Sequence, residues 1–324
     1  MNNHLLTRAH LLRAALSAAA LAAAGCNQSK KKQIAVIPKG RAHVFWQSVH
    51  AGAVKAAREQ DVEIIWNGPA TETDFNAQIQ IMDAMINRKV DAICVAPIDK
   101  KVMVNVVERA TREKIPVVIF DSGIDTPQFV AQVMTDNKEA GRVAARRMGE
   151  ILAGKGKVVM VAVQPGGAST MLREEGFEEE IRNFPGIQIV DKRYGMSDYA
   201  KSLQVAENML TAVPDAAGLF ASNESSAAGA AQALKARAAS KVKAIGFDSS
   251  PALVADLKAG VFESLVIQDP FSLGYQSVLN ATKAINNQPV EKINNMPPQL
   301  VTQQNLATSE VQAKLNPDLK KYLD

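Results

Sequence analysis

The sequence predicts an α/β protein made of two doubly wound lobes, each with a parallel sheet covered by helices. From Gln33 onward, short apolar runs alternate with helix-length amphipathic segments, which is the pattern of βα units. Two of the apolar runs end in an acid, at Asp121 and at Asp248. Ligands of open α/β sheets bind beyond the carboxyl ends of the strands, so these acids indicate two sheets that face one cleft.

The first series of elements covers the chain as far as residue 134. Its apolar runs have no polar face, as expected of strands that are covered on both sides. Its longer segments repeat apolar residues on one helical face, such as Val49, Ala53 and Ala56. The predicted strands are 34–37, 62–66, 92–95, 115–120 and 129–134, and the predicted helices are 45–60, 74–88 and 101–112.

A second series repeats this order in the rest of the chain. Gly154 and Gly156 follow its first helix and mark where that helix ends. The predicted strands are 158–163, 187–190, 218–221, 242–247 and 265–267, and the predicted helices are 138–152, 171–183, 199–212, 225–236 and 271–286. An Asn- and Pro-rich segment, 287–299, and a short apolar run at 300–301 then precede a polar tail.

The first 26 residues have the composition of an export signal. Arg8 and Arg13 form a positive region before an apolar run, 14–24, that is too short to span a bilayer as a mature helix. The Ala-Ala-Gly-Cys at 23–26 resembles a lipoprotein lipobox with Cys26 as the lipidated residue, although the usual leucine is an alanine. The alternative is an ordinary signal peptide with an incidental cysteine. We therefore predict an exported protein, in the periplasm or at the cell surface, anchored to the membrane through Cys26.

Charge and reactive residues exclude several classes of function. The formal net charge of +4 is spread along the chain without a basic stripe and interleaved aromatics, so nucleic acid is not an expected partner. Cys94 lies inside an apolar run, where a free cysteine acts as a small buried hydrophobe, and no disulfide is expected. His43 and His50 have no nearby cysteine or paired acid, so we expect no metal site, and no motif indicates a cofactor.

Seven short motifs occur in order along the chain. They are His43-Val44-Phe45-Trp46, Phe120-Asp121, Thr135-Asp136-Asn137, Arg173-Glu174-Glu175-Gly176-Phe177, Phe220-Ala221-Ser222-Asn223-Glu224, Gly246-Phe247-Asp248 and Gln268-Asp269-Pro270. Each motif alone is weak, but their order and spacing together are specific. Over roughly 33–306 the chain resembles a type I periplasmic binding protein of the ribose-binding kind.

The resemblance implies two similar lobes that are joined by three hinge crossovers and close on a sugar. Carried over to this chain, the crossovers fall near Thr135, near Gln268 and Asp269, and near Pro298. The implied first lobe is 33–134 plus 269–297, the second lobe is 135–268 plus 298–306, and 307–324 is a C-terminal tail. The second lobe would therefore interrupt the first.

The resemblance also implies three charged ligand contacts, each with a simpler alternative. Asp121 and Asp248 would accept hydrogen bonds from sugar hydroxyls. Asp248 could instead cap a helix that starts at 249–251, and Asp121 could be a turn acid. Arg173 would donate to the ligand, or it would be an exposed helix charge paired with Glu178.

The other implied contacts are two amides and an aromatic pair. Asn223 is a helix N-cap, a ligand contact or both, and Gln268 either touches the ligand or only holds the crossover. Phe45 and Trp46 begin a helix, and adjacent rings cannot share one helical face, so at least one should point into the cleft. We expect Trp46 to stack on a face of the sugar.

Two positions depart from the ribose-binding pattern. Such proteins carry an arginine after the first aspartate, where this chain has Ser122, and an asparagine shortly before the aromatic pair, where it has His43. His43, Ser122 and Thr135 are further possible ligand contacts. Because Ser122 replaces an arginine, we expect a neutral sugar or cyclitol rather than a sugar phosphate.

The function that the resemblance implies is transport. An exported, monomeric solute-binding protein would capture the sugar and deliver it to the permease and ATPase of an ABC transporter. A ligand-sensing protein that serves a membrane receptor or kinase is the alternative with the same fold. A sugar-acting enzyme is less favoured, since no GxGxxG follows the first strand and no P-loop is present, and we expect no catalytic residues.

Overall fold

The computed structural model describes residues 31–237 and 241–323. The chain divides into two units, Met1–Lys31 and Lys32–Asp324, and the helices and strands of the described residues belong to the second. The predicted export signal and Cys26 lie outside the described residues. Within the described part of the chain, no helix is both long and apolar enough to cross a membrane.

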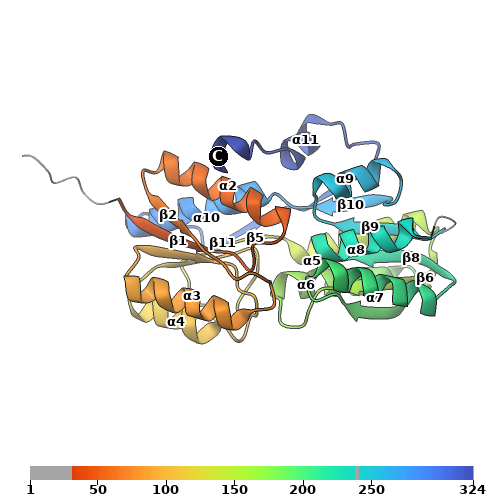
Figure 1. Ribbon diagram of the computed structural model, residues 1–324, viewed down its shortest axis with the longest axis horizontal. Helices are drawn as coiled ribbons and strands as arrows, with labels where there is room; N and C mark the ends of the chain where they lie inside the picture. The colour runs from red at the N-terminus through yellow and green to blue at the C-terminus, as the bar shows by residue number, and fades with distance from the viewer. Residues whose placement is uncertain (1–30, 238–240, 324) are drawn as a thin grey trace, which may run out of the picture. The chain divides into compact units, whose positions relative to one another are not determined.

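The sheet of the first lobe has six strands in parallel pairs (Figure 1). In spatial order they are β11 (Ile293–Met296), β5 (Ala131–Thr135), β4 (Val117–Phe120), β3 (Ala92–Val95), β1 (Gln33–Ile37) and β2 (Glu63–Trp66). One face is covered by α2 (Val44–Glu59) and α10 (Pro270–Ile285), and the other by α3 (Phe75–Arg88) and α4 (Val104–Arg112). In β1, Ile34 and Val36 pack under the first helix pair. Ala35 and Ile37 pack under the second, because alternate strand residues face opposite ways.

The sheet of the second lobe also has six strands. In spatial order they are β12 (Gln299–Val301), β10 (Ser264–Ile267), β9 (Lys243–Phe247), β8 (Ala216–Ala221), β6 (Lys155–Ala162) and β7 (Gly186–Tyr194). All pairs are parallel except that of β10 with β12. One face is covered by α5 (Asn137–Ile151), α6 (Ala168–Glu180) and the 3-10 turn η1 (Ile181–Asn183), and the other by α7 (Tyr199–Ala212), α8 (Glu224–Lys235) and α9 (Pro251–Lys258). The predicted fold class is confirmed.

The chain passes between the two lobes three times. It leaves the first lobe after β5, returns to it after β10 and leaves it again after β11. Each lobe is therefore built from separate segments of the chain, and all of these crossings follow the ends of strands.

Several observed elements differ from the prediction, among them the helices α11 (Ser309–Leu315) and α12 (Lys320–Leu323) in the predicted polar tail. The Asn- and Pro-rich segment 287–299 contains β11, which lies at a sheet edge and pairs with β5 through backbone bonds that do not require apolar side chains. The helix α9 is missing from the predicted series of elements, although a helix start at 249–251 was considered as an alternative for Asp248. It begins after Ser250, whose side chain accepts from the Leu253 N–H. The strand β7 continues beyond residue 190 as far as Tyr194, also at a sheet edge.

Each lobe has two helices that contact closely at glycines. A Cβ at Gly52 would lie 1.9 Å from the Phe271 carbonyl oxygen, between α2 and α10. A Cβ at Gly141 would lie 1.9 Å from the Arg173 carbonyl oxygen, between α5 and α6. No side chain fits at such a distance, so glycine is required at both contacts. The second contact sets the position of the backbone that carries Arg173.

The C-terminal tail contacts both lobes. In α11 (Ser309–Leu315), Val311 is buried in the core of the second lobe. The last helix, α12 (Lys320–Leu323), packs on α2 of the first lobe. Arg58 of α2 donates hydrogen bonds to the carbonyl oxygens of Lys321 and Tyr322. The tail therefore joins the two lobes again beyond the third crossing.

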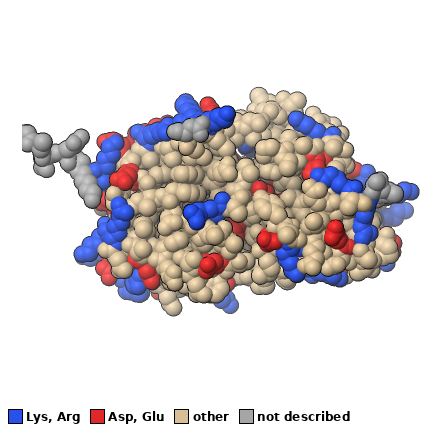
Figure 2. Space-filling view, in the orientation of Figure 1, with Lys and Arg blue, Asp and Glu red and all other residues tan. Residues whose placement is uncertain are grey.

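Charged side chains are scattered over the face shown in Figure 2. Lys and Arg lie there among Asp and Glu, and a large part of the face carries neither kind. No continuous basic stripe crosses this face of the molecule. It has no feature typical of a surface that tracks a phosphate backbone.

Candidate ligand-binding site

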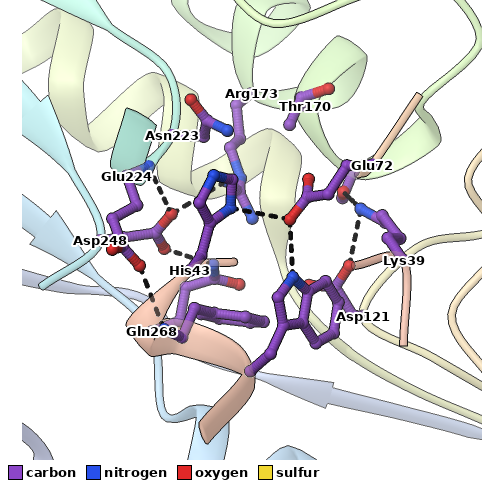
Figure 3. Close-up of a pocket in the computed structure, with 13 residues that line it drawn as sticks. Lys39, His43, Glu72, Asp121, Thr170, Arg173, Asn223, Glu224, Asp248 and Gln268 are labelled. Atoms are coloured by element: carbon purple, nitrogen blue, oxygen red, sulfur yellow. Dashed lines mark hydrogen bonds and ion pairs between the residues drawn. The ribbon is translucent and has the colours of Figure 1, made fainter. Parts of the chain in front are cut away.

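A small cavity lies between the two lobes (Figure 3). It lies beyond the carboxyl ends of β1, β4, β8, β9 and β10, beside the starts of α2 and α6. The lining residues are Lys39, His43, Phe45, Trp46, Glu72, Asp121, Ser169, Thr170, Arg173, Asn223, Glu224, Asp248 and Gln268.

The two predicted aspartates lie at equivalent strand tips. Asp121 follows β4 with a φ of 58°, and Asp248 follows β9 with a φ of 68°. The Asp121 N–H donates to the Val133 carbonyl of β5 at 2.9 Å. The Asp248 N–H donates to the Val266 carbonyl of β10, also at 2.9 Å. Left-handed backbone is unfavourable for most residues but tolerated by aspartate, and here it ends both strands with a carboxylate in the cavity wall.

Asp121 forms an ion pair with a lysine. The Lys39 ammonium lies 2.7 Å from Asp121 Oδ2 and donates to Ser169 Oγ at 2.9 Å. Lys39 follows β1 in the first lobe and is only 5% exposed, whereas Ser169 is in α6 of the second lobe. Among the described residues, Lys39 is the one partner of the Asp121 carboxylate, which leaves lone pairs for a ligand hydroxyl.

Asp248 is surrounded by hydrogen-bond donors. Gln268 Nε2 donates to Asp248 Oδ1 at 2.6 Å, and the Glu224 N–H donates to Oδ2 at 3.0 Å. Arg173 Nη1 lies 3.9 Å from the same Oδ2. Burial raises the pKa of Asp248 above its ordinary value, and Arg173 opposes that shift.

Arg173 is buried, and the alternative of an exposed helix charge is wrong. It is 2% exposed, and its Nε donates to Asn137 Oδ1 at 2.7 Å. Its Nη1 donates to the Ser222 carbonyl at 3.1 Å. Glu178, the partner in that alternative, pairs with Lys192 instead. These bonds hold the guanidinium in the cavity wall.

Glu72 enters the cavity from the loop between β2 and α3. Its Oε1 accepts from Trp46 Nε1 at 2.6 Å and lies 2.8 Å from His43 Nδ1. Burial alone would lower the pKa of His43, but Glu72 raises it to about 9. Burial alone would raise the pKa of Glu72, but His43 and neighbouring donors lower it to about 2. The pair is therefore an imidazolium and a carboxylate at neutral pH.

Glu224 of the second lobe binds the start of α2 in the first. It accepts from the Val44 N–H at 3.2 Å and from the Phe45 N–H at 3.1 Å. An anion at this place is stabilised by the free N–H groups and the helix dipole. Its Oε1 also accepts from the Tyr199 hydroxyl at 2.7 Å. The N-cap residue of α2, His43, makes no side-chain cap, so the opposite lobe supplies one.

Further hydrogen bonds join the lobes around the cavity. Ser197 Oγ donates to Glu72 Oε2 at 2.8 Å, and Gln164 Nε2 donates to the Glu72 carbonyl at 2.9 Å. The Ser169 N–H donates to Ser122 Oγ at 3.3 Å. The structure therefore has the lobes closed on the cavity.

Eight sequence-predicted residues line the cavity, and two more of the simpler alternatives can be judged. Asn223 Oδ1 accepts from the Ser226 N–H at 2.9 Å, so Asn223 is an N-cap as well as a lining residue. The cap of α9 is Ser250, so the proposal that Asp248 caps this helix is wrong. The eight are His43, Phe45, Trp46, Asp121, Arg173, Asn223, Asp248 and Gln268.

The other two possible contacts, Ser122 and Thr135, are buried outside the cavity lining. The Ser122 hydroxyl accepts from the Ser169 N–H of the second lobe. The Thr135 hydroxyl donates to Gln268 Oε1 at 2.7 Å. Both rings of the aromatic pair line the cavity, in an edge-to-face arrangement with centroids 4.9 Å apart. The Trp46 indole is oriented by its bond to a carboxylate, which no local pattern indicates.

Sequence reasoning missed five lining residues. Lys39 comes shortly after a predicted strand and Glu224 directly follows Asn223, so the strand-tip rule could have found both. No local signal marks Glu72, which lies in a loop away from any strand tip. The five are Lys39, Glu72, Ser169, Thr170 and Glu224.

The histidines differ from the prediction in one respect. His43 does have a paired acid, Glu72, which lies 29 positions away in the sequence. His50 stacks on Trp66 with ring centroids 4.4 Å apart. Within the part of the chain that the structure describes, no group of three or more His, Cys, Asp and Glu side chains could hold a metal ion.

The cavity wall contains three cations and four carboxylates. Each of its three cations lies beside a carboxylate, and the fourth carboxylate binds the start of α2. The wall also offers amides, hydroxyls and two aromatic rings. Such a site suits an uncharged ligand that has many hydroxyl groups.

Comparison with known proteins supports the same conclusion. The D-ribose/D-allose-binding protein of Pseudomonas aeruginosa is 34% identical over 268 residues, which cover 79% of this chain and 82% of that protein. A carbohydrate transporter solute binding protein from Agrobacterium radiobacter, solved in complex with D-arabinose, is 32% identical with a TM-score of 0.86, covering 89% of this chain and all of that one. An ABC transporter solute binding protein from Agrobacterium vitis with bound D-fucose is 35% identical with a TM-score of 0.85, covering 88% of this chain and all of that one.

The family model described as "Periplasmic binding protein domain" matches residues 34–289, most of the chain. The resemblance found in the sequence motifs is confirmed, and the chain belongs to the periplasmic binding protein domain family.

Proposed function

We propose that this protein captures a small neutral sugar or cyclitol between its lobes and delivers it to the permease of an ABC transporter. The observation that supports this most is the cavity, where carboxylates, cations and amides from both lobes surround a space beside Phe45 and Trp46. Hydroxyl groups are donors and acceptors at once, so such a wall can satisfy them, and the rings suit apolar C–H faces.

The relatives favour this ligand class. D-arabinose, D-fucose, D-ribose and D-allose, which appear in their descriptions, are uncharged monosaccharides. Family members of this kind are binding proteins of transporters rather than enzymes. The ligand contacts that we propose are Phe45, Trp46, Asp121, Arg173, Asn223, Asp248 and Gln268.

A calorimetric screen of the purified protein tests this function. Pentoses, hexoses and cyclitols should include a ligand that binds without turnover, while the matching sugar phosphates should not bind. At 100 to 1,000 times its dissociation constant, such a ligand should raise the free energy of unfolding by about 3–4 kcal/mol. A panel without any binder, or one in which product forms, would reject the proposal.

The capture mechanism that we propose is closure of the lobes. Crossings at strand ends allow hinge bending, and a ligand that contacts both lobes favours the closed form. X-ray scattering with and without the best ligand should show compaction. Identical profiles at saturation would contradict closure.

We also propose that the protein is exported and anchored through a lipidated Cys26, which lies outside the described residues. The Cys26→Ala variant should leave the membrane fraction, and mass spectrometry of the parent should find a lipidated amino-terminal cysteine. A parent that is soluble, with its amino terminus elsewhere, would reject the anchor.

A further inference from the structure

Glu72 is the one lining residue that comes from a long loop rather than from a strand tip or helix start. Its two carboxylate oxygens are used separately. Oε1 binds Trp46 Nε1 and His43 Nδ1 of the first lobe, and Oε2 accepts from Ser197 of the second. One side chain therefore controls an aromatic ring, a charged ring and a contact between lobes.

The His43 ring has one nitrogen left for a ligand. Nδ1 is taken by Glu72, and Nε2 has no hydrogen-bond partner among the described residues. The ring is 4% exposed, lines the cavity and meets the Tyr199 ring edge-on, with centroids 5.2 Å apart. Besides Glu72 and Tyr199, the ionisable groups that act on it are Glu224 and Asp248. Figure 3 shows it in the middle of the site, between the groups of the two aspartates.

We propose that Glu72 is a specificity-determining positioning residue, which orients His43 so that its Nε2–H donates to an acceptor oxygen of the bound sugar. This inference rests on the proposed sugar-binding function. The group opposite Nε2 is then a hydroxyl, ring or carbonyl oxygen of the ligand, and a sugar that lacks this oxygen is discriminated against.

The charge of His43 decides which of two roles Nε2 has. An imidazolium donates from both nitrogens, whereas a neutral ring that donates from Nδ1 has a lone pair at Nε2. Glu72, with smaller contributions from Glu224 and Asp248, raises the pKa of His43 to about 9 against the effect of burial, so in the parent protein both nitrogens donate at neutral pH. Replacing Glu72 with glutamine keeps the shape but removes this charge, so the pKa of His43 should fall and Nε2 should become an acceptor at mildly alkaline pH.

Calorimetry with the best sugar from the screen tests the inference. At about pH 8, Glu72→Gln should weaken binding on the order of 10- to 100-fold, since a hydrogen bond to a charged donor is lost and a lone pair replaces it. Lowering the pH to about 5.5 should restore much of the affinity of this variant, because His43 regains its proton. In the parent His43 keeps its proton over this range, so the affinity ratio of parent to variant should shrink as the pH falls, whereas any effect of Asp248 is common to both proteins.

Three further variants isolate the cause. Glu207→Gln removes a carboxylate from the exposed face of α7 and should bind like the parent. Ser197→Ala removes the contact with Glu72 and the acceptor of Asn223 Nδ2 but leaves His43 and Glu72 in place, so it should weaken binding without the pH effect of Glu72→Gln. In the double variant His43→Gln with Glu72→Gln, the pH dependence should disappear. Monodeoxy analogues of the sugar give a second test. The analogue that lacks the oxygen bound by His43 Nε2 should bind the parent weakly. Its affinity should fall little further in the Glu72→Gln variant.

Nuclear magnetic resonance gives a readout that does not need the sugar. The ring nitrogens of His43 should titrate near pH 9 in the parent and at clearly lower pH in Glu72→Gln. If the parent binds no sugar, the proposed function fails. If the parent binds a sugar but Glu72→Gln binds it equally well at both pH values, the inference about Glu72 is wrong while the function stands.

Discussion

Asp121 and Asp248 occupy equivalent places in the two lobes but are stabilised in different ways. Both follow a central strand with left-handed backbone, and both donate their N–H to the next strand. Asp121 has a buried ammonium at 2.7 Å, whereas Asp248 has two neutral donors and a guanidinium nitrogen at 3.9 Å. Repetition of the fold therefore repeats the position of the carboxylate but not its electrostatic environment.

This difference indicates different roles for the two walls. In the first lobe the carboxylate and its cation stabilise each other, and removing either leaves a buried charge. In the second lobe the carboxylate shares its site with neutral donors, and burial raises its pKa. The free energy of unfolding should therefore fall when either partner is removed from the wall of the first lobe. The contribution of the second wall should instead depend on pH.

The largest effect is expected for Asp121→Ala. It leaves the Lys39 ammonium buried without its carboxylate, which should lower the free energy of unfolding by about 3–5 kcal/mol. Urea denaturation of the ligand-free protein measures this. The double variant with Lys39→Met removes both charges and should recover most of the stability. If Asp121→Ala alone is as stable as the parent, the two walls do not differ in the way that we propose.

Glu224→Gln tests the contact that the second lobe makes with the first. The variant keeps an acceptor for the start of α2 but loses the charge that the helix dipole favours and that binds the Tyr199 hydroxyl. We expect a loss of about 1–2 kcal/mol in urea denaturation. Glu150→Gln, on the outer surface beside Arg147, is the matched control and should change stability by less than about 0.5 kcal/mol. Equal effects of the two variants would contradict this role of Glu224.

Asp248→Asn should change how stability depends on pH. The folded pKa of Asp248 is raised, so the native state binds this proton more tightly than the unfolded state does. Its contribution to stability is complete below the unfolded pKa and is lost as pH rises through the folded pKa. The variant lacks this loss, so relative to the parent it should gain stability as the pH rises from the unfolded pKa of an aspartate, about 4, through the raised folded pKa. If the stabilities of parent and variant change with pH in parallel, burial does not raise the pKa of Asp248.

Thr135→Val tests the smallest link, from the first crossing to the wall of the second lobe. The Thr135 hydroxyl donates to Gln268 Oε1, and Gln268 donates to Asp248. The variant leaves a buried amide oxygen unpaired, so we expect a loss of about 1 kcal/mol, measured by thermal denaturation. Thr135→Ser keeps the hydroxyl and should lose less. If valine and serine behave alike, the link does not stabilise the protein.

Much of the fold could be predicted because the signals of its elements are local. The strands β3 and β4 were marked by continuous apolar runs, and α7 by its apolar periodicity. The strand β11 could not be predicted in this way, because an edge strand with the sequence INNM is held by backbone bonds to β5 and has no apolar run. Local sequence patterns therefore do not predict a strand that is held by backbone hydrogen bonds rather than by burial of apolar side chains.

By itself the sequence determined which residues end the strands, and therefore that Asp121 and Asp248 face one cleft. Strand ends follow from apolar runs, which are local, and the carboxyl ends of parallel strands meet at one edge. Only the tertiary structure decided the electrostatics of that cleft. Glu72 meets Ser197, 125 positions away, and Lys39 meets Asp121, because folding brings their loops together. The charge of a buried group depends on such neighbours in space, and no local pattern in the sequence contains them.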